Sequence, residues 1–156
     1  MRNKQKGFSL IELLIVVAII LIIAAIAIPN LLRSRMAANE ASAVGGLRTI
    51  NTSCVTYSST YGGFPPALAN LGPGNPATPA TADLIDSVLA TGTKAGYTFA
   101  YTAGAQDAQG NYLDYSITAV PVTVGTTGQR RFFTDQSGVI RANPIGAADV
   151  NSTPIS

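Results

Sequence analysis

The chain has 156 residues, of which 12% are charged, and a formal net charge of +2, so it can hold one domain and a membrane segment. It contains no histidine, which excludes His-dependent catalytic triads and His-ligated zinc. Its one cysteine, Cys54, excludes an intrachain disulfide and a cysteine-cluster metal site. We therefore expect no enzyme, no metal site and no cofactor.

An apolar segment near the N-terminus is long enough to cross a membrane. From Leu10 to Ile28 the chain has nineteen residues, and Glu12 is the one charged residue among them. As an α-helix this segment covers roughly 28 Å, close to the thickness of the hydrocarbon layer. Three cations in the first seven residues favour a cytoplasmic N-terminus, but Arg33 and Arg35 closely follow the segment and weaken that bias.

Glu12 requires an explanation, because an acid at the centre of a membrane helix costs roughly 2.5–3.5 kcal/mol. The residues alone leave four interpretations open. Glu12 could lie at the interface of a plain signal anchor, or the segment could be a secretory signal peptide cut near Ala25-Ile26-Ala27. The segment could also be the buried core helix of a soluble protein. In the fourth interpretation it is a processed anchor in which Glu12 has a function.

The residues around Glu12 resemble the processing and assembly segment of type IV prepilins. The resemblance runs from Lys6 to Glu12 (KGFSLIE), continues through the apolar residues, and ends with AIAIP at Pro29. It implies cleavage between Gly7 and Phe8, N-methylation of Phe8, and retention of the apolar segment in the mature chain. It also implies that Glu12 pairs with the terminal amine of a neighbouring subunit during assembly.

Helical patterning continues beyond Pro29, where we expect a kink because proline removes a backbone hydrogen bond. Residues 30–61 are predicted to form an amphipathic continuation of the helix. Its apolar positions recur at spacings of three and four, namely Leu47, Ile50, Cys54, Tyr57 and Tyr61, with Leu32, Met36 and Ala43 extending the stripe backwards. The charged residues of this stretch, including Glu40, are placed largely off the stripe. Gly45 and Gly46 mark a candidate flexible point.

The C-terminal part is predicted to be a head of residues 62–156. Its first segment, 62–81, contains nine glycines or prolines in twenty positions, so we expect an extended loop there. A short helix is predicted at 82–91, capped by Thr81. Alternating residues then predict four antiparallel strands: one hairpin turning at 107–111, and a second pair at 129–134 and 138–142.

These patterns predict an α+β fold, in which a long N-terminal helix packs against a four-stranded antiparallel sheet. Half of this helix spans the membrane and half is amphipathic. The predicted divisions are a cleaved leader (1–7), a transmembrane and assembly helix (8–29), the amphipathic continuation (30–61) and the head (62–156).

The resemblance implies a structural subunit of a type IV pilus. Its partners would be identical subunits, a prepilin peptidase and N-methyltransferase, the pilus assembly machinery of the inner membrane, and membrane lipid before assembly. The precursor would cross the inner membrane once and the filament would stand at the cell surface. The alternatives are a periplasmic pseudopilin of a type II secretion system and an anchored or secreted binding domain.

Two weaker patterns carry little weight. Oxygen-bearing residues between Asp107 and Asp114 could face a calcium ion, but they fit a solvated turn better. Arg130 and Arg131 are two adjacent cations, too few to indicate direct contact with nucleic acid.

Overall fold

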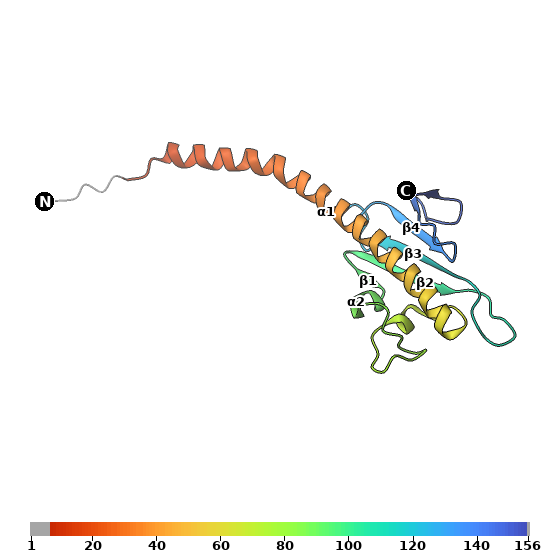
Figure 1. Ribbon diagram of the computed structural model, residues 1–156. Helices are drawn as coiled ribbons and strands as arrows, with labels where there is room; N and C mark the ends of the chain where they lie inside the picture. Colours follow the sequence, from red (N-terminus) through yellow and green to blue (C-terminus); the bar gives the residue numbers. More distant parts are fainter. Residues whose placement is uncertain (1–6, 156) are drawn as a thin grey trace. The chain divides into compact units, whose positions relative to one another are not determined.

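The computed structural model describes residues 7–155, so the predicted leader lies outside the described residues except for Gly7. The chain divides into two compact units, Met1–Arg35 and Met36–Ser156. Helix α1, Leu10–Tyr61, contributes residues to both units (Figure 1).

The first unit is helical from Leu10 onward, and the helix continues without a break through Pro29. A proline in a helix leaves a carbonyl of the preceding turn without its usual N–H partner. Beside it, the Asn30 side-chain amide donates a hydrogen bond of 3.1 Å to the carbonyl of Ile26. The helix is therefore not terminated by Pro29, and the kink remains a prediction.

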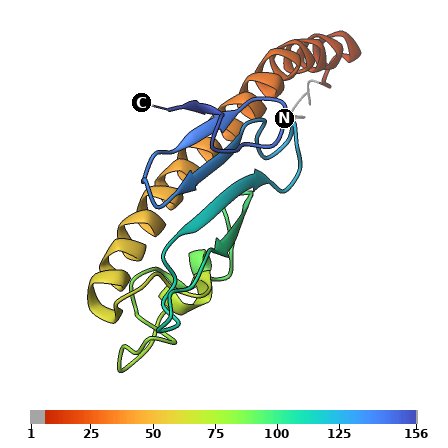
Figure 2. The same ribbon diagram turned by 90° about the vertical axis from the view of Figure 1, so that its right-hand side faces the viewer.

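The second unit, which we call the head, contains the rest of α1, two short helices and one antiparallel sheet. The sheet is a meander in the order β1-β2-β3-β4-β5-β6, and each strand pairs with the next along the chain. The remaining elements are η1 Leu68–Leu71, α2 Ser87–Ala90, β1 Thr93–Lys94, β2 Tyr97–Ala103, β3 Tyr115–Pro121, β4 Arg131–Asp135, β5 Arg141–Asn143 and β6 Thr153–Pro154. Figure 2 shows α1 lying along the sheet.

The sheet has six strands, so the prediction of four was wrong in number. The four predicted strands are present as β2, β3, β4 and β5. The two additional strands, β1 and β6, are two residues long each and lie at the edges of the sheet. Two residues cannot show a period-2 alternation, which is the pattern from which strands are predicted.

The short helix predicted at 82–91 is confined to Ser87–Ala90, and its cap is Asp86 rather than Thr81. The Asp86 carboxylate accepts a hydrogen bond of 3.0 Å from the N–H of Leu89. The residues before it are not helical because their N–H groups bond elsewhere. Four of them donate to carbonyls around η1, those of Asn70, Leu71 and Gly72. The segment 62–81 is a loop as predicted, apart from the single 3₁₀ turn η1.

The core of the head lies between α1 and the sheet. The predicted stripe on α1 is confirmed by the burial of Ala43, Leu47, Ile50, Cys54 and Tyr57, and Tyr61 packs partly buried against them. On the sheet, alternate residues face the same core, namely Tyr97, Phe99, Tyr115, Ile117, Ala119 and Phe132. Along the backward extension of the stripe, Met36 is half-buried and Leu32 is exposed, so burial against the head ends near Met36.

Two residues of α1 show how closely it packs on the sheet. A side chain at Gly46 would begin 3.0 Å from the ring of Phe99, so glycine permits the approach of the helix at this point. Further along α1, the Asn51 side-chain amide donates a hydrogen bond of 2.8 Å to the buried Thr134 hydroxyl. Its oxygen accepts a hydrogen bond of 3.1 Å from the Tyr115 hydroxyl. The helix–sheet interface is therefore mainly apolar, with a polar bridge at Asn51. Gly46 permits close packing, whereas a side chain at Gly45 would meet nothing within 4 Å.

Candidate processing and assembly segment

The first described residues lead into α1 through a local cap. Gly7 and Phe8 are exposed and lie before the helix. The backbone N–H of Ser9 donates a hydrogen bond of 2.9 Å to Oε2 of Glu12, while the Leu13 N–H donates to the Ser9 carbonyl at 3.2 Å. Ser9 therefore stands at the N-cap and Glu12 at the third helical position, with the spacing of a capping box.

This cap gives Glu12 a role that our sequence analysis missed. A carboxylate in the first helical turn occupies the positive end of the helix dipole and satisfies one of the N–H groups that the helix leaves free. The spacing Ser-x-x-Glu before an apolar run is the signal that could have predicted it. Glu12 remains exposed, so its carboxylate can accept a further hydrogen bond or a cation.

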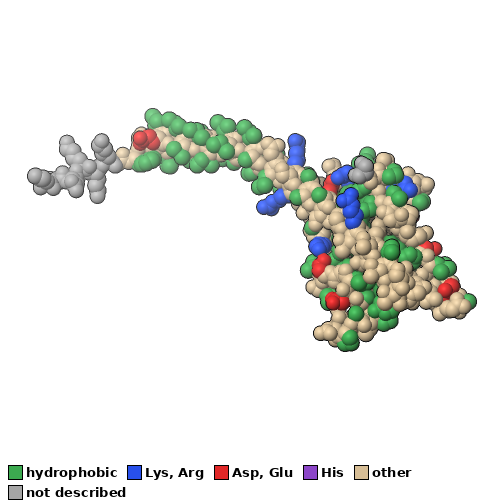
Figure 3. Space-filling view, viewed as in Figure 1, with side chains coloured by type: hydrophobic (Ala, Val, Ile, Leu, Met, Phe, Trp, Pro, Cys, Tyr) green, Lys and Arg blue, Asp and Glu red, His purple; other side chains and the backbone are tan. Residues whose placement is uncertain are grey.

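The apolar segment that follows is exposed on all sides. Among the described residues, α1 is the one helix long and apolar enough to cross a membrane, and none of its most apolar window is buried. Figure 3 shows hydrophobic side chains covering this part of the helix, with one acid at its start. Soluble monomers rarely expose apolar patches above a few hundred Å². This surface therefore requires lipid or other protein chains around it.

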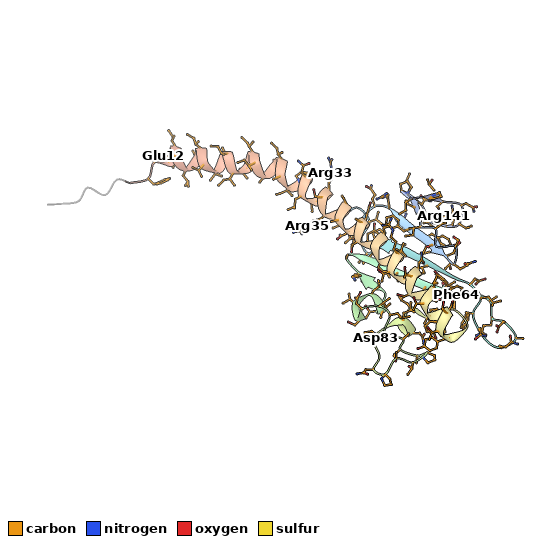
Figure 4. All side chains as sticks on the ribbon, in the orientation of Figure 1. Glu12, Arg33, Arg35, Phe64, Asp83 and Arg141 are labelled. Carbon is orange, nitrogen blue, oxygen red and sulfur yellow. The ribbon has the colours of Figure 1, made fainter. Side chains whose placement is uncertain are left out.

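Two arginines mark the end of the apolar surface. Arg33 and Arg35 are exposed and project from different sides of α1 (Figure 4). The ion pairs found among residues 7–155 are Lys94–Asp86 and Arg130–Glu40, and neither involves them. Arg33 lies five residues beyond Ile28, about 7.5 Å along a helix, a distance that suits the headgroup region of a membrane.

Comparison with known proteins agrees with this geometry. Residues 2–28 match the model of the prokaryotic N-terminal methylation motif. The chain is 68% identical over 40 residues to the type IV wide pilus major component PilA4 of Thermus thermophilus. This match covers 26% of this chain and 30% of that relative. The N-terminal segment is therefore similar to those of proteins that carry this methylation motif.

Two other relatives match a somewhat longer part of the chain. The type IV major fimbrial protein FimA of Dichelobacter nodosus is 50% identical over 58 residues, 35% of this chain and 37% of that protein. The type IV major pilin protein PilA of Myxococcus xanthus is 43% identical over 56 residues, 36% and 26% respectively. The chain thus spans about a third of the length of the curated relatives it matches. No solved structure matches it.

Beyond the N-terminal segment, the structure places the charged residue Glu40 differently from our prediction. It is buried in the head rather than off the apolar stripe. Its carboxylate accepts hydrogen bonds from the N–H groups of Gln129 and Arg130, at 2.9 and 3.1 Å, and from Nε of Arg130 at 2.7 Å. Burial opposes ionisation of Glu40, but these hydrogen bonds outweigh it and lower the pKa of the carboxyl.

The same contacts occupy Arg130. Its guanidinium pairs with Glu40 and lies 5.4 Å from the centre of the Phe132 ring. Arg131 donates to the carbonyls of Ile145 and Gly146. Both arginines therefore hold parts of the head together, which leaves little reason to assign them to phosphate binding.

Cys54 and Asp107 have structural roles as well. Cys54 is fully buried, and burial raises the pKa of its thiol to about 12, against the opposite effect of Tyr101 and Tyr115. The Asp107 carboxylate accepts hydrogen bonds from the N–H groups of Gln109 and Asn111, both at 2.8 Å, and from the Asn111 side chain at 3.1 Å. Among the described residues, no group of three His, Cys, Asp or Glu side chains could hold a metal ion.

Proposed function

We propose that the chain is a structural subunit of a type IV pilus. The observation that carries the proposal is the fully exposed apolar part of α1, headed by Glu12 and matching the N-terminal methylation motif. Three relatives that the chain resembles over 40, 58 and 56 residues are named as major pilus or fimbrial components. The head supplies a globular body, whose core is formed by α1 and the sheet.

Processing would come first. The precursor crosses the inner membrane once with its N-terminus in the cytoplasm, and lipid surrounds Leu10–Ile28. A prepilin peptidase hydrolyses the bond between Gly7 and Phe8, and an N-methyltransferase methylates the new amine of Phe8. Because Gly7 and Phe8 lie exposed before the first helical turn, the bond between them is accessible without unfolding α1.

Assembly would then exchange lipid for protein around the apolar helix. Packing of neighbouring helices in the filament buries most of the surface, and Glu12 sets their register by pairing with the Phe8 amine of a neighbour. Two buried charges that meet with good geometry compensate each other's loss of hydration, whereas either one alone is strongly unfavourable. A single buried polar contact of this kind also specifies register in coiled coils.

The test is the material sheared from the cell surface, examined by electron microscopy and by an antibody against the head. The proposal expects long filaments that contain this chain and that vanish when its gene is deleted. Chain confined to the periplasm in short assemblies would instead indicate a type II secretion pseudopilin. Chain found as a free monomer in the medium would contradict both assembly functions and leave an anchored or secreted binding domain.

A further inference from the structure

The head presents one isoleucine to solvent on a tightly held loop. Ile145 is 86% exposed, the largest value among the exposed large hydrophobic residues of the described chain. It remains exposed although it borders a cavity of about 430 Å³ above strands β3 and β4. An isolated exposed apolar residue is ordinary, but this one stands on a loop whose conformation is fixed by several hydrogen bonds.

Those hydrogen bonds come from two side chains, Asn143 and Arg131. The Asn143 Oδ1 accepts from the N–H groups of Ile145 and Gly146, at 3.0 and 2.9 Å, and its Nδ2 donates to the Ala147 carbonyl at 2.9 Å. Arg131 donates to the carbonyls of Ile145 and Gly146. Ile145 is therefore held in place before any partner binds, which reduces the entropy lost on binding.

A pocket of matching character lies elsewhere in the head. Its volume is about 260 Å³, and its walls include Tyr61, Phe64, Tyr112 and Pro66. Hydrogen bonds hold these walls together. The Phe64 N–H donates a hydrogen bond of 2.9 Å to the Tyr112 carbonyl. The hydroxyl of Tyr57, also in the wall, donates one of 2.8 Å to the Pro79 carbonyl. An apolar cavity of about 150 Å³ is sufficient for a benzene ring, so the pocket has room for an isoleucine side chain.

The two features lie at opposite ends of the head. Figure 2 shows the chain after β5 at one end, and the segments 62–81 and 104–114 at the other, beside the end of α1. Figure 4 marks the same separation by Arg141, in β5, and Phe64, in the pocket wall. Ile145 thus cannot reach the pocket of its own head, but a second head displaced along α1 could receive it.

Charge favours the same pairing. Segments 62–81 and 104–114 contain the acids Asp107 and Asp114 and no lysine or arginine. The loop residues 144–152 contain one acid, Asp149, and two arginines, Arg131 and Arg141, donate to carbonyls of this loop. Each end of the head is therefore attracted to the opposite end of another copy, and two identical ends repel.

We propose that Ile145 of one subunit docks into the pocket formed by Tyr61, Phe64 and Tyr112 of a second copy of this chain. The contact is heterologous, because it joins different surfaces of the two copies, and a heterologous contact that does not close into a ring repeats along a filament. The proposal rests on the proposed function and adds a contact between neighbouring heads to the packing of the apolar helices.

The first experiment compares Ile145→Ser with Val88→Ser, a matched control for an exposed residue on α2 that is 54% exposed. Burying one exposed isoleucine strengthens association by about ten- to a hundredfold. We expect I145S to lower the yield of sheared filaments by about tenfold or more, with normal amounts of chain in the membrane. Ile145→Leu should restore filaments, and V88S should assemble like the unaltered chain. Equal yields from I145S and V88S would overturn the proposal.

The second experiment tests the pocket itself. A chain carrying Ile145→Cys and Pro66→Cys should form ladders of disulfide-linked subunits in filaments under mild oxidation, and each single variant should not. Cys54 is buried and is present in all three chains as an internal control. Filaments without ladders would overturn the docking while leaving the pilus intact. Absence of filaments from the unaltered chain would instead overturn the proposed function, and the docking with it.

Discussion

Glu40 and Arg130 form an ion pair between α1 and the chain just before β4, with 2.7 Å between Oε2 and Nε. The other oxygen of Glu40 accepts two backbone N–H groups of the same segment. Asn39 adds a hydrogen bond of 2.8 Å from its side chain to the Thr127 carbonyl. Together these contacts fix the chain between β3 and β4 to the helix.

Replacing Glu40 by glutamine should destabilise the head by about 1–3 kcal/mol, because a hydrogen bond to a charged group contributes about that much. The loss is limited because about half of the Arg130 side chain is exposed, so that water screens its charge. The free energy of unfolding of the purified full chain, measured with urea, checks this value. Lys94→Ala removes the other, exposed ion pair and should cost less than about 1 kcal/mol. Equal losses in the two variants would contradict a special role for Glu40.

The Glu40 carboxyl should also make stability depend on pH. Its pKa in the folded head is lowered from the ordinary value of 4.5. Its contribution is therefore complete above about pH 4.5 and is lost as the pH falls through the folded-state pKa. Unfolding midpoints measured between pH 7 and pH 3 should fall less steeply in E40Q than in the unaltered chain. Parallel curves for the two proteins would show that another carboxyl controls the acid limb.

Gly45 and Gly46 are adjacent in the sequence but should respond oppositely to alanine. Nothing lies near a side chain at Gly45, so Gly45→Ala should stabilise the helix by about 0.5–1 kcal/mol. At Gly46 the new methyl group would meet the Phe99 ring at 3.0 Å, and overpacking of a core typically costs about 1–3 kcal/mol. Thermal unfolding of the two variants measures the difference. Similar midpoints would mean that the ring moves aside freely.

Asn51 is expected to contribute substantially to the stability of the head through its two hydrogen bonds to the sheet. Asn51→Ala leaves the buried Thr134 and the Tyr115 hydroxyl without this partner, and an unsatisfied buried group costs about 1–3 kcal/mol. The neighbouring Thr52 is a suitable control, because it is exposed and its hydroxyl donates to the Arg48 carbonyl of its own helix. Thr52→Ala should change the free energy of unfolding by less than about 0.5 kcal/mol. A loss at Asn51 no larger than this would show that water replaces the bridge.

Glu12 combines a cap with a charge, and two substitutions separate them. Glu12→Gln keeps an oxygen that can accept from the Ser9 N–H but removes the charge, whereas Glu12→Ala removes both. If Glu12 pairs with the amine of a neighbour, both variants should insert into the membrane and be cleaved, yet yield few filaments. Counting filaments in the sheared fraction of each variant distinguishes the two roles. Normal assembly of E12Q with failure of E12A would assign the residue to helix capping instead.

The sequence predicted the parts of the fold that repeat a pattern. The spacing of Leu47, Ile50 and Cys54 identified the buried face of α1, and alternation in β2 and β3 identified the hairpin. Interactions between distant residues were not predictable in this way. Glu40 was placed off the stripe because a carboxylate rarely lies in a core, and its partners are about ninety positions further along the chain. The spacing of residues that are close in the sequence cannot reveal partners so far along the chain.

The candidate site, too, could be predicted from the sequence only in part. Gly7, Phe8 and Glu12 were identified by their resemblance to prepilins, and residues 2–28 match the methylation motif. The cap between Ser9 and Glu12 was within reach of the sequence, since its spacing is local. The exposure of Ile145 and the distant pocket were not, because a residue's exposure depends on how loops from different parts of the chain are held.

Processing as a prepilin and subsequent assembly would both be visible in the N-terminal peptide of the native protein. Its mass should be measured for chain from membranes and from sheared surface material. We expect a chain that begins at Phe8, carries one added methyl group and is present in the sheared fraction. An intact leader, or a chain that begins at Ile28 after a signal-peptide cleavage, would contradict it.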